Sequence, residues 1–224
     1  DVARFGLEAS DGWITSPDVD DSLLPEDVTQ PLAPFADPEF RIEATLHSFS
    51  SFLRRHDYSE DSIAALLGLT SLQSLEPTHL YWHSAFQLPD TPLADLVRLF
   101  LLRDTLQCGR VSELLTPKVV NALLCLGLLV ADEKGDLSST VDLFCSGGMV
   151  FATDHRYQLR EGDCLDEDPV MYIGMDSHGL VQTAPRQSVD SVLDLCCGSG
   201  VQGLVASRYS IRVVAVDLNP RAVR

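Results

Sequence analysis

The chain has 224 residues, of which 45% are hydrophobic and 22% are charged, and its formal net charge is −17. These numbers allow one large or two small domains and exclude a chain that is disordered throughout. No apolar stretch approaches the ~18 residues that span a bilayer, which excludes a membrane anchor, and the acidic excess argues against nucleic-acid binding over the whole surface.

The acidic excess belongs to two segments. Residues 1–40 contain ten acidic residues and one basic residue, and residues 131–168 contain ten acidic and three basic residues. Five of the twelve prolines lie in residues 1–38, where hydrophobic periodicity is weak. We therefore predict an acidic flexible lead-in over residues 1–38, either simply solvated or able to dock onto a basic partner.

Residues 39–168 predict a mainly α-helical, winged-helix-like domain that contains a β-hairpin. Apolar side chains at helical spacing and capping residues predict three helices, which run from Pro38 to His56, from Ser59 to Gly68 and from Thr91 to Asp104. Shorter elements follow, namely helices at 111–115 and 117–126, extended stretches at 128–131 and 137–144, and a turn at 146–148 that leads into a strand at 149–153.

This domain has few residues suited to DNA or metal binding. Its candidate recognition helix contains a single basic residue, Lys118, so packing or substrate positioning is favoured over groove binding. The acidic residues at 161–168 lack the spacing of an EF-hand, and no Glu follows His79 in a metalloprotease pattern with His83. We therefore predict no metal site.

The six cysteines contain no Cys-x-x-Cys pair, which argues against a zinc ribbon and a thioredoxin-like site. Several lie in apolar runs, as Cys125 does, where a thiol packs as a small hydrophobic group. Free thiols in the cytoplasm or another reducing compartment are favoured over disulfides. The N-terminal residues also lack a basic and apolar signal pattern, so we expect no secretory or transit peptide.

Residues 169–224 predict a linker hairpin followed by the first βαβ half of a Rossmann-like α/β sheet. The pattern is a buried strand at 192–195, a glycine turn at 197–200, a helix at 201–207, and a second strand at 213–216 that ends at Asp217. Such a turn lets a ligand approach the backbone closely, and an acid in the position of Asp217 can accept both hydroxyl groups of a ribose.

Two classes of cofactor fit this pattern. Gly198, Gly200 and Gly203 match the dinucleotide spacing Gly-x-Gly-x-x-Gly, which indicates an NAD-dependent oxidoreductase as one alternative. However, a carboxylate at Asp194 would repel a pyrophosphate, whereas it would attract the sulfonium and ammonium groups of S-adenosylmethionine. The charge of Asp194 therefore favours S-adenosylmethionine.

The motif Asp194-x-Cys196-x-Gly198-x-Gly200 resembles the first motif of class I S-adenosylmethionine-dependent methyltransferases, and Ala215–Pro220 resembles their next one. More narrowly, both segments resemble the small-domain methyltransferases, which include glutamine-N5 and N6-adenine methyltransferases. The strong match covers about 35 residues, and it departs from the family at Cys196, where a glycine is usual. The preceding helical domain is similar in character to the substrate-selecting domains of such enzymes.

The resemblance implies a role for each matching residue. Asp194 would face the methionine end of the cofactor, and the turn formed by Cys196, Gly198, Ser199 and Gly200 would allow its close approach. Asp217 would bind the ribose hydroxyls, and Leu218 would border the adenine. The two adjacent cysteines are expected to pack rather than react, because methyl transfer proceeds by direct displacement.

The family's catalytic Asn-Pro-Pro-aromatic segment is absent from this sequence, so no catalytic residue is predicted. We expect a truncated form of a longer enzyme or, alternatively, a split protein, with self-association through the incomplete sheet edge. The leading hypothesis is an N-methyltransferase for a macromolecular substrate, either a basic protein such as a release factor or ribosomal protein, or RNA or DNA. A non-catalytic acidic module that binds a basic partner is the alternative.

Overall fold

The computed structural model describes residues 8–10, 13–15, 42–76, 82–83, 88–155, 169–170 and 172–223. The protein is a mixed α/β chain that divides into two compact units. The helical unit comprises Asp20–Asp142, and the βα unit comprises Asp1–Val19 together with Leu143–Arg224. The predicted domain boundaries, at residues 38 and 168, lie outside the described residues. Among the described helices, none has the length and apolar character that crossing a membrane requires.

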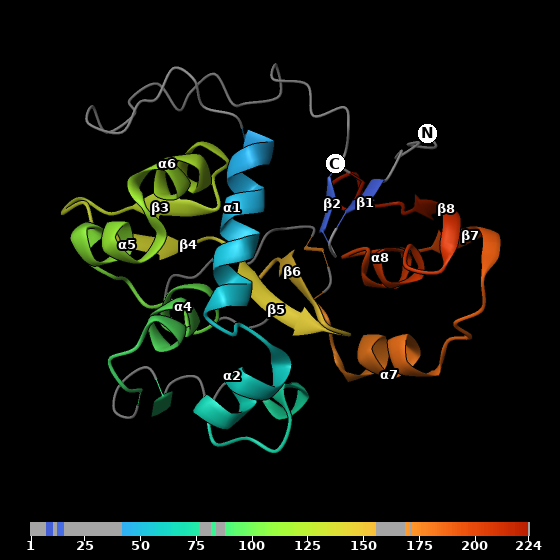
Figure 1. The fold of residues 1–224 in the computed structure, drawn as a ribbon, viewed down its shortest axis with the longest axis horizontal. Coiled ribbons are helices and arrows are strands. Elements are labelled where there is room, and N and C mark those ends of the chain that lie inside the picture. The colour runs from blue at the N-terminus through green and yellow to red at the C-terminus, as the bar shows by residue number, and fades with distance from the viewer. Residues whose placement is uncertain are drawn as a thin grey trace. The chain divides into compact units, whose positions relative to one another are not determined.

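The helical unit contains the elements that Figure 1 draws from light blue, at α1, to yellow-green, at β3 and β4. In chain order they are α1 (Ile42–Arg55), α2 (Glu60–Leu66), the 3-10 helix η2 (Leu72–Ser74), α4 (Pro92–Phe100), α5 (Cys108–Leu115), α6 (Pro117–Cys125), β3 (Leu129–Ala131) and β4 (Leu137–Ser139). The core includes Phe49 and Phe100, whose ring centroids lie 5.5 Å apart. Both rings are almost completely buried.

Two predicted caps are confirmed. The hydroxyl of Ser59 accepts a hydrogen bond from the Ser62 N–H at 3.4 Å, and the hydroxyl of Thr91 accepts one from the Ala94 N–H at 3.3 Å. Each side chain satisfies a backbone donor that the first helical turn leaves unpaired. Because capping depends on neighbours in the sequence, these helix starts could be predicted.

The predicted end of the third helix is wrong. Helix α4 ends at Phe100 rather than Asp104, and Arg103 has a left-handed backbone with φ of 55°. The Arg103 side chain donates to Asp142 at 3.1 Å, and both side chains are buried. This ion pair lies 39 residues apart in the sequence, so the local pattern could not indicate it.

The strand predicted over 137–144 is interrupted. Strand β4 pairs antiparallel with β3 and ends at Ser139, and β5 (Asp142–Ser146) begins after a short break. In this break the Ser139 hydroxyl donates to the Val141 carbonyl at 2.7 Å and accepts from the Val141 N–H at 3.2 Å. A serine that bonds to nearby backbone in this way competes with ladder hydrogen bonds.

The βα unit begins with two short antiparallel strands, β1 (Glu8–Ser10) and β2 (Trp13–Thr15). They occupy part of the predicted flexible lead-in, and aromatic and β-branched residues in β2 favour a strand. The rest of residues 1–38 lies outside the described residues. The lead-in prediction therefore needs correction at these two strands.

The predicted hairpin turn is confirmed between β5 and β6 (Met149–Thr153). Gly147 and Gly148 form the turn, with φ of 59° and 74°. Positive φ at both central residues is the requirement of a type I′ hairpin, which glycine meets without steric cost. The Arg208 guanidinium donates to both glycine carbonyls, so the turn is bonded to the connection between α8 (Val201–Ala206) and β8 (Ser210–Val216).

The linker contains a helix in place of the predicted hairpin. Helix α7 runs over Met175–Thr183, with Gly174 at its N-cap and Asp176 in its first turn. An acid in the first turn favours helix, and Val181 contributes a buried side chain on the inner face. Tertiary burial of this face therefore explains the difference from the sequence-based expectation.

A parallel βαβ segment ends the described chain, as predicted. Strands β7 (Val189–Leu195) and β8 (Ser210–Val216) pair with Asp194 opposite Ala215, and α8 (Val201–Ala206) connects them. Figure 1 shows α8 beside both strands, in orange and red. The predicted burial of β7 is wrong for Leu193 and Leu195, which are 58% and 66% exposed, because side chains alternate between faces and α8 covers the face of Asp194.

Candidate functional site

The candidate cofactor site lies at the carboxyl ends of β7 and β8. The glycine turn over 196–200 follows β7, and a second turn over 217–219 follows β8. The Cys197 N–H donates to the Val216 carbonyl at 3.1 Å, and the Gly198 N–H donates to the Asp217 carboxylate at 2.7 Å. The structure therefore brings both predicted motifs together at the edge where α/β sheets bind their ligands.

The glycine turn uses the left-handed backbone at three positions. The φ angles are 60° at Cys196, 51° at Gly198 and 72° at Gly200. A Cβ placed at Gly198 would meet no atom within 4 Å, and one at Gly200 would lie 3.8 Å from Leu204. The two glycines thus serve the backbone conformation and leave open space beside the turn, in which a ligand can approach the backbone.

The positive φ at position 196 explains why a glycine is usual there in the methyltransferases that this motif resembles. A side chain on a left-handed residue crowds the following carbonyl, which costs about 1–2 kcal/mol. Cys196 accepts this strain with an exposed side chain, whereas the neighbouring Cys197 is buried. Burial raises the pKa of the Cys197 thiol, and the charges of Asp194 and Asp217 raise it further. The Cys197 thiol therefore stays protonated, which agrees with a packing role.

Asp194, near the end of β7, has a buried carboxylate that contacts the N-terminal part of α8. It is 8% exposed, and its Oδ2 accepts a hydrogen bond from the Gly203 N–H at 2.8 Å. Burial raises the pKa of Asp194 above its ordinary value, the hydrogen bond lowers it, and the charge of Asp217 raises it. A cation that binds near Asp194 would offset both the desolvation of this carboxylate and its repulsion by Asp217.

Gly203 is required for this approach of helix and strand. A Cβ there would lie 3.1 Å from Asp194 Oδ2 and 3.2 Å from Val213 Cγ1, both closer than ordinary contact. The sequence pattern included Gly203 as the third glycine of a dinucleotide motif. In the structure its N–H is already bonded to a carboxylate, so this donor is not available to a pyrophosphate.

Asp217 has the opposite electrostatic character. Its two oxygens accept hydrogen bonds from the N–H groups of Asn219, at 2.9 Å, and of Gly198, at 2.7 Å. These bonds, with a smaller contribution from the Leu218 N–H, hold the pKa of Asp217 below its ordinary value despite some desolvation. Each ionised oxygen has a second lone pair, so the carboxylate retains acceptor capacity for hydroxyl groups.

The remaining predicted site residues lie on the same two turns. Ser199 is half-buried within the glycine turn, and Leu218 is 99% exposed immediately after Asp217. An almost completely exposed leucine is available for contact with an apolar or aromatic ring. Six of the seven predicted site residues are therefore contributed by one pair of neighbouring turns, and the seventh, Asp194, lies near the end of β7.

No metal centre is found in the part of the chain that the structure describes, since no three His, Cys, Asp or Glu residues there form a group that could hold an ion. His83 is described and buried, whereas His79 and the acidic residues at 161–168 lie outside the described residues.

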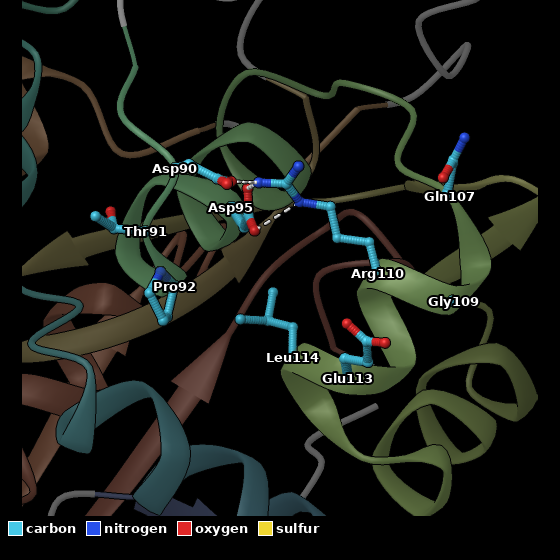
Figure 2. A pocket seen from close by; sticks show the side chains of 9 residues that line it. All are labelled: Asp90, Thr91, Pro92, Asp95, Gln107, Gly109, Arg110, Glu113 and Leu114. Carbon is cyan, nitrogen blue, oxygen red and sulfur yellow. Dashed lines mark hydrogen bonds and ion pairs between the residues drawn. The ribbon is translucent and has the colours of Figure 1, made fainter.

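Sequence reasoning missed a polar depression in the helical unit, which Figure 2 shows. We call it the Arg110 pocket; it encloses about 630 Å³ and is lined by Asp90, Thr91, Pro92, Asp95, Gln107, Gly109, Arg110, Glu113 and Leu114. Arg110 donates to both oxygens of Asp95, at 2.8 and 2.7 Å, and also to Asp90. The bonds to Asp95 raise the pKa of Arg110, so the guanidinium stays charged.

Asp95 is the central acceptor of this pocket. Its carboxylate is 9% exposed and also accepts from Arg98 at 2.8 Å. The two charge-assisted hydrogen bonds from Arg110 fix the start of α4 against the start of α5, and the bond from Arg98 lies within α4. Arg110 lies 15 residues from Asp95 and 20 residues from Asp90 in the sequence. No local motif could therefore have indicated the Arg110 pocket.

Comparison with known protein families gives a match in the helical unit. The profile of a domain of unknown function, DUF7059, matches residues 55–140, a span inside the helical unit that includes the Arg110 pocket. A search of curated protein sequences found no significant match.

Proposed function

We propose that the βα unit binds S-adenosylmethionine and that this chain acts within an S-adenosylmethionine-dependent N-methyltransferase. The observation that supports this most is the pair of carboxylates at the ends of neighbouring parallel strands. Asp194 is buried with a raised pKa, and Asp217 has a lowered pKa on the adjoining turn. The first suits a cation and the second suits a diol, and S-adenosylmethionine contains both.

The proposed contacts divide the cofactor into three parts. Asp194 would attract the sulfonium or the ammonium group, directly or through water, and Asp217 would accept from the ribose hydroxyls. Leu218 would border the adenine, and Cys196, Gly198, Ser199 and Gly200 would form the surface that the cofactor approaches. When bound, S-adenosylmethionine would supply an electrophilic methyl group. The residues of this chain bind and orient that group, and none of them is proposed to react.

The competing NAD reading is less well supported by the geometry. A pyrophosphate on a glycine turn uses N–H groups at the start of the following helix. Here the Gly203 N–H is bonded to Asp194, and the Gly198 N–H is bonded to Asp217. A pyrophosphate would therefore have to displace carboxylates while sharing their charge. We retain an NAD-dependent oxidoreductase as an outcome of the binding test.

The proposed substrate is an amide or amino nitrogen of a macromolecule, either a protein glutamine or a nucleic-acid adenine. The acidic excess over residues 1–40 favours a basic protein, such as a release factor or ribosomal protein, over RNA or DNA. The described cysteines have free thiols, which supports a reducing compartment such as the cytoplasm.

Calorimetry tests the cofactor proposal directly. We expect the full chain to bind S-adenosylmethionine but not NAD, and Asp217→Ala to weaken that binding by ~1–3 kcal/mol, the range for hydrogen bonds to a charged group. Asp190→Ala, an exposed acid on the same pair of strands, is the matched control and should bind normally. Binding of NAD alone would refute the methyltransferase assignment, and an unchanged affinity of Asp217→Ala would refute the ribose contact.

The Arg110 pocket favours a second candidate function, that of a module that binds a basic partner. Its lining contains three carboxylates and one guanidinium, and the Glu113 side chain has no ion-pair partner among the described residues. We propose that this pocket accepts a lysine or arginine side chain of a protein. Titration with a lysine-rich peptide tests this, since Glu113→Gln should weaken binding and Glu133→Gln, on an exposed turn, should not.

A further inference from the structure

A bidentate ion pair connects the end of β6 with the turn that contains Asp217. Arg221 donates to Asp154 through Nη1 at 2.7 Å and through Nη2 at 2.9 Å. The two residues lie 67 positions apart in the sequence, and both belong to the βα unit. Two parallel hydrogen bonds fix the orientation of both side chains as well as their distance.

Asp154 is itself held in place by a second bond. Its Oδ2 also accepts from the Val170 N–H at 2.8 Å, and its side chain is 20% exposed. The carboxylate therefore lies at a junction of three segments, which are the end of β6, the backbone at residue 170 and the turn after β8. An exposed ion pair between flexible side chains contributes little, but one anchored by a further backbone bond has a fixed geometry.

Consecutive hydrogen bonds lead from Arg221 back to Asp217. The Arg221 N–H donates to Asn219 Oδ1 at 2.9 Å, and the Asn219 N–H donates to Asp217 Oδ1 at 2.9 Å. Each is a side chain that accepts from the N–H two residues later, the bond that shapes an Asx turn. The position of Asn219, and with it one of the two donors to Asp217, therefore depends on where Arg221 is held.

We propose that Asp154 and Arg221 are positioning residues, whose ion pair holds the turn over 217–222 so that the Asp217 carboxylate faces a cofactor ribose. The inference rests on the proposed function for its ligand, but the orientation of Asp217 can be measured without one. According to this proposal, Asp154, at the end of the β5–β6 hairpin, contributes to the affinity for the cofactor. The motif of the glycine turn does not indicate this contribution.

The first experiment follows the carboxyl group of Asp217 by carbon-13 NMR while the full, unliganded chain is titrated. In Asp154→Asn we expect the pKa of Asp217 to rise toward its ordinary value, because a relaxed turn loses the Asn219 donor. Loss of a nearby negative charge by itself would lower that pKa, so the sign of the change separates repositioning from simple electrostatics. Asp190→Asn is the matched control.

The second experiment measures the affinity for S-adenosylmethionine by calorimetry. We expect about threefold to tenfold weaker binding for Asp154→Asn and for Arg221→Gln, with recovery in Asp154→Glu, which restores the charge and the acceptor pair. If Asp154→Asn does not fold, as judged by circular dichroism, Asp154→Ser, which also removes the negative charge, provides the pKa measurement, and Arg221→Gln provides the affinity measurement.

The outcomes separate the two proposals. An unchanged pKa of Asp217 and an unchanged affinity in folded variants would overturn the positioning role while leaving the cofactor assignment intact. If the unmodified chain does not bind S-adenosylmethionine, the proposed function fails, whereas a raised pKa of Asp217 in Asp154→Asn would still support the positioning of this carboxylate.

Discussion

The two units of this protein differ in how completely they bury their apolar side chains. In the helical unit, large residues such as Phe100, Leu96 and Leu115 are at most 1% exposed. In the βα unit, Leu193, Leu195 and Ile211 are 58%, 66% and 85% exposed on the two parallel strands. Helices packed around one another close a core by themselves, whereas a parallel sheet normally needs cover on both faces. The comparison indicates that the helical unit has a closed core, whereas β7 and β8 leave apolar side chains exposed among the described residues of the βα unit.

The largest expected effect tests this contrast in stability. Phe100→Ala should lower the free energy of unfolding by about 3–5 kcal/mol, because it removes a buried ring and leaves a cavity. In dilute solution, where the chain is not associated, Leu195→Ala should change it by less than about 0.5 kcal/mol, as is usual for an exposed side chain. Urea denaturation followed by circular dichroism measures both. A large loss in Leu195→Ala would show that this face of β7 is covered in solution.

The exposed face and the open edge of β7 and β8 also predict self-association. Unpaired strand edges and exposed apolar faces promote pairing with another copy. Sedimentation velocity should show association that increases with concentration, and Leu195→Ser should reduce it. A compact monomer at every concentration would contradict the prediction.

The next effect concerns the contrast between Asp194 and Asp217 within the site. Because the pKa of Asp194 is raised, acidification protonates it before Asp217 and removes the charge that we propose attracts S-adenosylmethionine. Below that pKa the affinity for S-adenosylmethionine should fall by up to tenfold per pH unit, or about 1.4 kcal/mol. Calorimetry from neutral to mildly acidic pH measures this, and Asp194→Asn should bind weakly with a flat profile. An identical pH dependence in Asp194→Asn would exclude Asp194 as its origin.

The two carboxylates should also affect folding in opposite directions. The lowered pKa of Asp217 means that its stabilising contribution is complete above its ordinary value of 3.8 and is lost as the pH falls through the lower native value. The raised pKa of Asp194 means that the native state binds a proton more readily than the unfolded chain, so acidification through that value favours folding.

A smaller effect compares two helical glycines in the βα unit. Gly203→Ala should destabilise the fold by about 1 kcal/mol, because crowding against Asp194 and Val213 outweighs the better helix propensity of alanine. Gly179→Ala, where a Cβ meets no atom within 4 Å, should instead stabilise by up to about 1 kcal/mol. Thermal unfolding of both variants provides the check. Equal changes in melting temperature for the two variants would show that α8 moves to accommodate the added methyl group at position 203.

The smallest effect concerns the strained cysteine of the glycine turn. Cys196→Gly should stabilise by about 0.5 kcal/mol, since relief of the left-handed strain exceeds the entropy that glycine adds to the unfolded chain. Cys196→Ala removes the thiol but keeps the backbone strain. Its free energy of unfolding, measured by chemical denaturation, should therefore equal that of the unmodified protein. A stabilised Cys196→Ala would assign the effect to the thiol.

Elements whose signals are local could be predicted from the sequence. The caps at Ser59 and Thr91, the turn at Gly147 and Gly148, and the βαβ segment with its glycine turn are confirmed. Each depends on residues within a few positions of one another, where backbone sterics and capping hydrogen bonds act. For the same reason the sequence indicated the two turns that the structure brings side by side.

Features that depend on distant residues required the tertiary structure. The Arg103–Asp142 pair lies where α4 ends early, burial of Val181 accompanies a helix in the linker, and α8 covers only one face of β7. The same holds inside the site, where Gly203 admits the Asp194 carboxylate and Arg221 reaches Asp154. The sequence by itself determined which residues can bend, cap or ionise. Only the fold decided which of these groups meet, because burial and hydrogen bonding act between neighbours in space.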